Sequence, residues 1–140
     1  MGNTIPIVQK VGFEDVQWVM NKRKGKYILI NTLDSQNQSC LIPNTLSVET
    51  ETKVINDCMK HGKAIIVIYG RNITDETAVK KYHQLLSLGF SSIYVYSGGL
   101  FEWLCLQDIF GDEQFPTTTK ITDILQFKPI SRFHNNYLEN

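Results

Sequence analysis

The chain has 140 residues, 42% of them hydrophobic, and its 14 basic and 14 acidic residues leave no formal net charge. A chain of this length can bury one core but not two, so we expect a single small domain. Balanced charge argues against the basic surface that nucleic-acid phosphates require, so we expect no nucleic-acid partner. No apolar run approaches the length of a membrane span, so we also expect no membrane partner and an intracellular, cytosolic location.

Strands and helices alternate along the first half of the chain. Residues 5–8 predict a short edge strand, and residues 27–32 (YILINT) predict a strongly apolar one. Residues 33–43 are polar and without a period, which is typical of a loop, and residues 51–61 predict a helix. Residues 13–20 predict another helix, whose core face should consist of Phe13, Val16, Trp18, Val19 and Met20.

The next forty residues form a strand-loop-helix-strand unit. An uninterrupted β-branched run at residues 65–68 favours a central parallel strand that is covered on both faces. Residues 77–88 have helical spacing and are followed by Gly89, and residues 93–96 predict the next parallel strand. The alternation indicates an α/β fold with a mainly parallel central sheet of about five strands, flanked by helices.

The last part of the chain predicts shorter elements. The helical pattern continues to residue 110, a turn follows, and residues 121–127 form a short helical patch that Pro129 stops. We expect residues 1–128 to form the domain and residues 129–140 to be a polar C-terminal tail.

The element order and three short motifs resemble a single rhodanese-like domain, the fold of sulfurtransferases, over about residues 5–107. The most specific motif is LGF followed by a strand and then by Gly98, Gly99 and Trp103, which is similar to the second rhodanese signature. Residues 29–32 (LINT) look like the strand that ends in Asp-Val-Arg, and residues 41–45 (LIPNT) look like the His-Ile-Pro-Gly-Ala turn. The resemblance implies a three-layer fold around the sheet.

The sequence departs from the family at the position directly after the central strand. Rhodaneses place a cysteine there, since sulfur transfer needs a thiolate that attacks the sulfane sulfur and holds it as a persulfide. This chain has Gly70, and the family's loop arginine falls near Asp75. The resemblance therefore implies a degenerate active-site loop with no catalytic residue, formed by Gly70, Arg71, Asn72, Ile73, Thr74, Asp75 and Glu76.

The residues of this loop and of the glycine turn also have purely structural interpretations. Thr74 is a candidate N-cap of the following helix, and Arg71 could bind an anion but more commonly would pair with Asp75 or Glu76. The glycine pair lacks the Gly-Lys-Ser/Thr continuation of a P-loop, which favours a tight backbone turn over a phosphate cradle. We expect Trp103 to pack against the core.

Cysteine and histidine patterns indicate neither a disulfide framework nor a metal site, and no cofactor is expected. Cys40, Cys58 and Cys105 are scattered through apolar segments and are interpreted as free buried thiols. His61, His83 and His134 share no ligand spacing. Cys40 is the one candidate for a replacement nucleophile, because in the rhodanese arrangement its turn lies toward the active-site edge, whereas Cys58 and Cys105 fall in helices facing the core.

Two functional classes follow from the resemblance. The favoured one is a catalytically inactive rhodanese-like module that acts in binding or protein interaction, with a protein partner whose identity the sequence does not give. The alternative is a sulfurtransferase or phosphatase-like enzyme with Cys40 as an unorthodox nucleophile.

Overall fold

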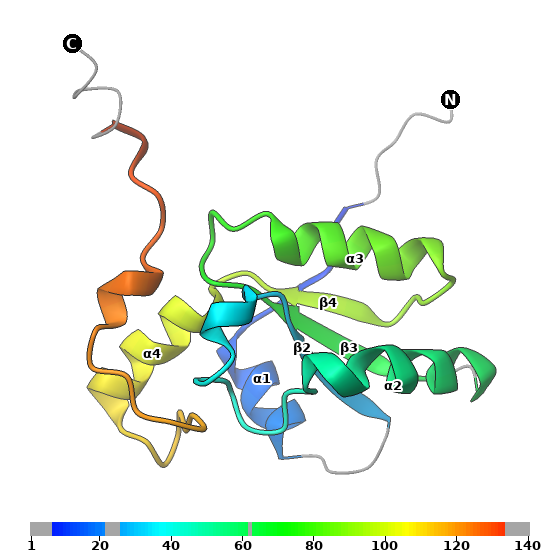
Figure 1. The fold of residues 1–140 in the computed structure, drawn as a ribbon, viewed down its shortest axis with the longest axis horizontal. Helices are drawn as coiled ribbons and strands as arrows, with labels where there is room; N and C mark the ends of the chain where they lie inside the picture. The colour runs from blue at the N-terminus through cyan, green and yellow to red at the C-terminus, as the bar shows by residue number, and fades with distance from the viewer. Residues whose placement is uncertain (1–6, 22–25, 62, 134–140) are drawn as a thin grey trace.

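The structure is a computed structural model that describes residues 7–21, 26–61 and 63–133. Helices and strands alternate along this part of the chain (Figure 1). The strands are β1 (Lys10–Val11), β2 (Tyr27–Asn31), β3 (Ile65–Tyr69) and β4 (Ile93–Tyr96). The α-helices are α1 (Phe13–Met20), α2 (Val48–His61), α3 (Thr77–Ser87) and α4 (Gly99–Phe110), and two short 3-10 helices are η1 (Ser35–Asn37) and η2 (Ile124–Phe127).

The four strands form one parallel sheet in the order β1-β4-β3-β2. β3 lies in the middle, where Val67 is in register with Leu29 of β2 and with Tyr94 of β4. The prediction that residues 27–32, 64–69 and 93–96 form buried parallel strands is confirmed, with boundaries that differ by at most one residue.

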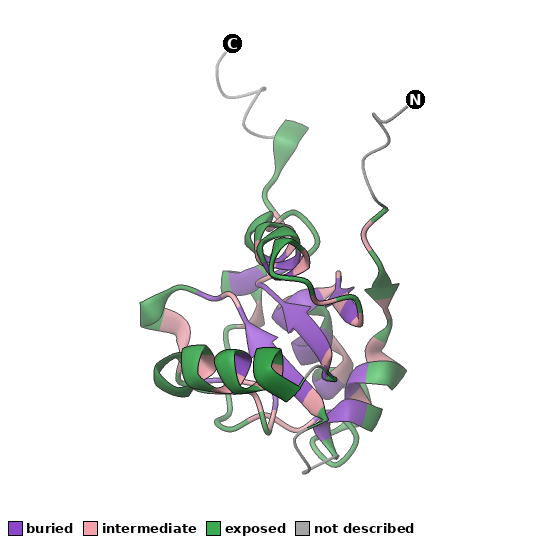
Figure 2. Ribbon diagram, turned by 90° about the vertical axis from the view of Figure 1, so that its right-hand side faces the viewer, coloured by how far each residue is buried: buried purple, intermediate pink, exposed green. Residues whose placement is uncertain are grey.

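Helices cover both faces of the sheet, as the β-branched run of β3 predicted. Successive side chains of a strand point to opposite faces. Leu29 and Val67 therefore pack in the cluster that contains residues of α1 and α4, whereas Ile28 and Ile66 pack in the cluster that contains residues of α2 and α3. Figure 2 shows the buried strands between helices whose outer faces are exposed. The predicted three-layer α/β fold is confirmed.

The sheet has four strands in the described residues, not the expected five. Residues 5 and 6 of the strand predicted at residues 5–8 lie outside the described residues, and β1 is placed later, with Lys10 beside Val95. Next to β2, the backbone makes one isolated parallel bridge, between Leu29 and Thr45. A single bridge does not extend into a strand, so this edge of the sheet ends at β2.

Trp18 is the residue of α1 that the sequence pattern misplaced. Its side chain is 57% exposed, whereas Val16, Val19 and Met20 are buried. Two residues correspond to about 200° of helical rotation, so Trp18 and Val16 cannot share one face. The expected core position of Trp18 was therefore wrong.

Two other helices differ from their predicted extents. α2 begins at Val48 rather than at residue 51, because the Ser47 hydroxyl accepts the Thr50 N–H (3.3 Å) and so caps an earlier start. η2 has four residues and occupies the end of the patch predicted at residues 121–127. None of the described helices combines the length and the apolar character needed to cross a membrane.

Candidate functional site

The loop of residues 70–76 connects β3 to α3 at the carboxyl end of the sheet, and the glycine turn after β4 packs directly against it. The carbonyl of Gly70 accepts the Leu100 N–H (2.9 Å), and the carbonyl of Arg71 accepts the Phe101 N–H (2.8 Å). The fold thus brings the degenerate loop and the signature turn together. Two N–H groups at the start of α4 are therefore bonded within the protein and are not available to bind an anion.

Gly99 is required at this contact for two reasons. Its φ of +67° lies in the left-handed region, which favours glycine. A Cβ at this position would also lie 2.7 Å from the carbonyl oxygen of Gly70 and 2.8 Å from the backbone nitrogen of Asn72. Gly99 therefore forms a close backbone-to-backbone contact with the β3–α3 loop.

Asp75 folds back across the loop and organises it. One carboxylate oxygen, Oδ2, accepts the Arg71 N–H (2.9 Å). The other, Oδ1, accepts the Thr77 N–H (3.0 Å) and the Thr77 hydroxyl (2.7 Å) at the start of α3. Asp75 rather than Thr74 thus satisfies the first turn of the helix, and the expectation that Thr74 is the N-cap was wrong.

These contacts set the charge state of Asp75. Partial burial by itself raises the pKa of this carboxyl, but the hydrogen bonds from Arg71 and Thr77 and the positive charge of Arg71 outweigh burial. The net effect is to hold the pKa of Asp75 below its ordinary value. A negative charge therefore stays fixed in the loop at neutral pH.

The Asp75 carboxylate also fills the space beside Gly70. A Cβ built on Gly70 would lie 2.5 Å from Oδ2 of Asp75 and 3.1 Å from the hydroxyl oxygen of Thr32. A Cβ atom essentially never lies within 3.0 Å of an atom outside its own residue and its two chain neighbours. A side chain at position 70 would therefore compete with the carboxylate for the same volume.

Arg71 contacts the C-terminal part of the chain rather than a carboxylate. Its guanidinium donates to the carbonyl of Gln126 and lies over the ring of Phe127, 4.9 Å from the centroid. The two ion pairs found within the described residues, Lys81–Glu51 and Lys120–Asp112, do not involve it. The expected pairing of Arg71 with Asp75 or Glu76 is therefore not formed.

Asn72 fastens the same C-terminal segment, which we call the strap (residues 126–130). The buried Asn72 amide nitrogen donates to the carbonyls of Phe127 (2.8 Å) and Lys128 (3.1 Å), while its amide oxygen accepts the N–H (2.9 Å) and hydroxyl (2.7 Å) of Thr74. The Thr74 hydroxyl in turn accepts the N–H of Ile130 (3.2 Å). The strap thus lies across the loop and extends into the segment that the sequence predicted as tail.

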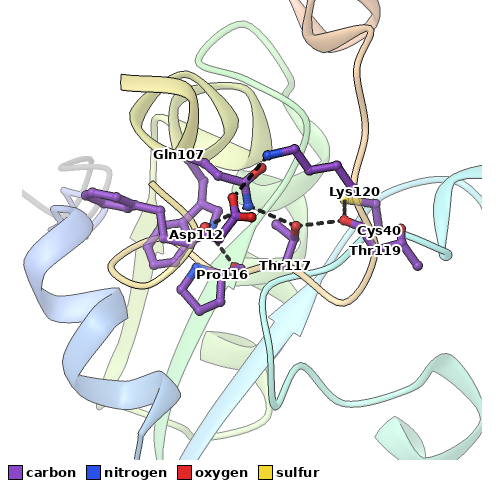
Figure 3. A network of polar contacts seen from close by, with 9 residues as sticks. Cys40, Gln107, Asp112, Pro116, Thr117, Thr119 and Lys120 are labelled. Carbon is purple, nitrogen blue, oxygen red and sulfur yellow. Dashed lines mark hydrogen bonds and ion pairs between the residues drawn. The ribbon is translucent and has the colours of Figure 1, made fainter. Parts of the chain in front are cut away.

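Cys40 is enclosed, and its side chain is 1% exposed. Its thiol donates to the carbonyl of Thr119 (3.4 Å), and the hydroxyl of Thr119 donates to the carbonyl of Ser39 (3.0 Å). Gln107 of α4 supports this cover by donating to Thr117 (3.0 Å), whose hydroxyl reaches the Thr119 carbonyl (2.7 Å) (Figure 3). A dissolved substrate has no access to a thiol at this position.

The other two thiols are partly exposed rather than in the core. Burial and the nearby Asp57 raise the pKa of Cys58, and burial with Asp108 and Glu102 raises that of Cys105. Both are therefore protonated at neutral pH, in which form a thiol is a poor nucleophile.

The part of the chain that the structure describes contains no group of three His, Cys, Asp or Glu side chains placed to hold a metal ion. His61 lies at the end of α2 and His83 on α3, while His134 lies outside the described residues.

Trp103 packs in the core, as predicted. Its side chain is fully buried and meets the rings of Tyr96 and Phe115 edge-on, with centroid distances of 6.4 Å and 5.1 Å. Its indole N–H donates to the carbonyl of Pro116 (2.8 Å). Trp103 thus anchors α4, and with it the turn that supports the loop.

Comparisons with known proteins match the fold. No family model and no curated protein sequence matches the chain. Among solved structures, similar ones include the As-Sb reductase from Leishmania major (17% identity, TM-score 0.56, covering 95% of this chain and 99% of that one). BH2092 from Bacillus halodurans gives 18% identity and a TM-score of 0.56, covering 86% of this chain and 90% of that one.

A further solved structure carries a family name. Ygr203w, described as a yeast protein tyrosine phosphatase of the rhodanese family, gives 12% identity and a TM-score of 0.53, covering 86% of this chain and 99% of that one. Identities this low bear on the fold alone. Together with the parallel sheet and its flanking helices, they show that the chain has a rhodanese-like α/β fold.

Proposed function

We propose that this chain is a catalytically inactive rhodanese-like module that acts by binding a protein partner. The observation that supports inactivity most directly is the Asp75 carboxylate, which takes up the volume beside Gly70 and accepts the N–H of Arg71. An anionic sulfur or phosphate donor needs free N–H donors and positive charge at that position. Here a fixed carboxylate occupies the position and repels such a donor.

The strap supports the same conclusion. The Arg71 guanidinium and the Asn72 amide, which are polar groups that could assist an anion, are bonded to the carbonyls of Gln126, Phe127 and Lys128. A substrate would have to displace these contacts as well as the carboxylate. The enzyme alternative with Cys40 would further require the enclosed thiol to become exposed.

A binding role is supported by apolar side chains around the covered loop. Ile73, Leu125 and Ile130 are 71%, 64% and 72% exposed. Ile73 and Leu125 lie next in sequence to residues of the loop-to-strap contacts, and Ile130 donates its own N–H to Thr74, so all three flank these contacts. Exposed apolar side chains that gather in one place are typical of a protein-binding surface.

Sulfur transfer from thiosulfate to cyanide tests the inactivity directly. We expect no turnover by the wild-type protein above that of Cys40→Ser, and none with an aryl phosphate as substrate. Turnover by the wild type that Cys40→Ser abolishes would establish the enzyme alternative and refute this proposal.

The binding role is tested by affinity capture with three baits. These are the wild type, the double variant Ile73→Lys/Leu125→Lys, and the control Ile109→Lys, which changes a 70% exposed apolar residue on α4. We expect a protein that the wild type and the control retain and the double variant loses. Equal recovery by all three baits would exclude this surface.

A further inference from the structure

A cavity of about 560 Å³ lies at the end of the sheet opposite the β3–α3 loop. Its lining includes three residues just before strands: Lys26 directly precedes β2, Lys63 lies two residues before β3, and Ser92 directly precedes β4. The volume falls within the roughly 300–1,000 Å³ typical of small-molecule sites. Since α/β sheets usually bind ligands at the carboxyl ends of their strands, a site here would be separate from the rhodanese-like loop.

One part of the cavity lining is apolar. Met59 near the end of α2, Leu88 after α3, and Phe90 line it, and the Met59 and Leu88 side chains are each 46% exposed. Exposed apolar side chains that border a concave surface offer contact area to the apolar body of a ligand.

The charged side chains that line the cavity are both positive among the residues that the structure describes. They belong to Lys26 and Lys63, and no described Asp or Glu lines the cavity. Within the described residues neither lysine forms an ion pair. Ser91 and Ser92, whose hydroxyls can donate hydrogen bonds, belong to the same lining. Two ammonium groups next to an apolar wall complement a molecule that carries both a negative group and an apolar body.

We propose that this cavity binds a small organic anion, a carboxylate, sulfonate or phosphate ester with an apolar body. The negative group lies between the two lysines, and the body packs against Met59, Leu88 and Phe90. The proposal does not depend on the function inferred for the β3–α3 loop.

Two fluorescent probes that differ in charge test the proposal. The anion 1-anilinonaphthalene-8-sulfonate is titrated into the wild type alongside its uncharged analogue N-phenyl-1-naphthylamine. We expect saturable binding of the anion at one site. Lys26→Glu and Lys63→Glu should each weaken anion binding at least about fivefold and leave binding of the neutral probe unchanged, because a charge reversal acts on the charged ligand alone.

Matched controls separate this site from general adsorption. Met59→Ala/Leu88→Ala should weaken binding of both probes, since it removes the apolar wall. Lys53→Glu, which reverses an exposed lysine on α2 outside the cavity lining, and Ile109→Ala should change neither affinity. All of the substituted residues are exposed, and thermal unfolding checks that each variant remains folded.

A second measurement uses the wild type alone. When the anion is added to 15N-labelled protein, the amide signals of Ser91 and Ser92 should shift in the NMR spectrum. Shifts confined to other parts of the chain, or lysine variants that bind the anion as tightly as the controls do, would overturn the proposal.

Discussion

The close contact between Gly70 and Asp75 predicts a measurable coupling between the two positions. Gly70→Ala places a Cβ 2.5 Å from Oδ2 of Asp75. Oδ2 is the oxygen that accepts the Arg71 N–H, so the carboxylate can make room only by weakening that bond, while the Thr77 contacts are made by Oδ1. A hydrogen bond to a charged group contributes about 1.5–3 kcal/mol, and partial exposure of this group reduces the figure to about 1–2 kcal/mol.

The same substitution behaves differently when Asp75 is absent. In an Asp75→Ala background the contact with the carboxylate no longer exists, but the 3.1 Å contact with the Thr32 hydroxyl remains. The lower entropy of the unfolded chain, worth about 0.4–1 kcal/mol, should therefore leave Gly70→Ala neutral or mildly stabilising there, and the Thr32 contact cancels in the cycle because it is present in both backgrounds. We therefore expect a coupling free energy of about 1–2 kcal/mol in the double-mutant cycle. Gly12→Ala, where a Cβ meets nothing within 4 Å, serves as the matched control and should not couple to Asp75.

Urea unfolding followed by far-UV circular dichroism measures all the free energies of this cycle, with constant m-values as the condition for comparing them. A coupling below about 0.5 kcal/mol, the range of independent sites, would show that the Asp75 carboxylate does not occupy the space beside Gly70.

Three further predictions concern the loop and its support. Gly70→Cys alone should transfer sulfur from thiosulfate to cyanide slowly. The double variant Gly70→Cys/Asp75→Arg should be measurably faster, because the second substitution removes both the steric contact and the negative charge. Equal rates for the two variants would show that Asp75 does not limit access to position 70. Trp103→Ala should lower the free energy of unfolding by about 3–5 kcal/mol in urea titration, since it empties a fully buried aromatic site, and an unchanged midpoint would contradict the burial. Asp75→Asn should cost stability above about pH 5 and progressively less as the pH falls below about 4 toward the lowered pKa of Asp75, because a carboxyl whose pKa is lowered by folding stabilises the protein only while it is ionised. A pH-independent difference in unfolding free energy would refute this assignment.

The sequence by itself determined the layers of this protein and the order of its elements. The β-branched run at residues 65–68 favours a strand that is covered on both faces, and the spacing of apolar residues before and after it predicts the flanking helices. The burial of Trp103 was also predictable, since a large aromatic after a glycine turn has few alternatives to the core. These features are local, and their physical cause lies within a few residues of where they occur.

The sequence singled out the loop of residues 70–76 and the glycine turn of residues 98–99, but it predicted neither their contact nor how the loop is filled. Asp75 could equally have faced solvent from its position just before α3, and only the path of the backbone from Gly70 brings its carboxylate to the N–H of Arg71. The side-chain direction of Trp18 shows the same limit, because an apolar residue off the main stripe of a helix can be placed only once the packing is known.

Tertiary structure alone decided the contacts between segments far apart in the chain. Asn72 donates to the carbonyl of Phe127, and Thr119 covers Cys40. No periodicity or composition in the sequence indicates either pairing. A backbone carbonyl accepts a hydrogen bond whatever side chain its residue carries, so the identity of the partner is not written in the sequence. Such contacts depend on the path that the chain follows after α4, and that path is determined only when the whole core has packed.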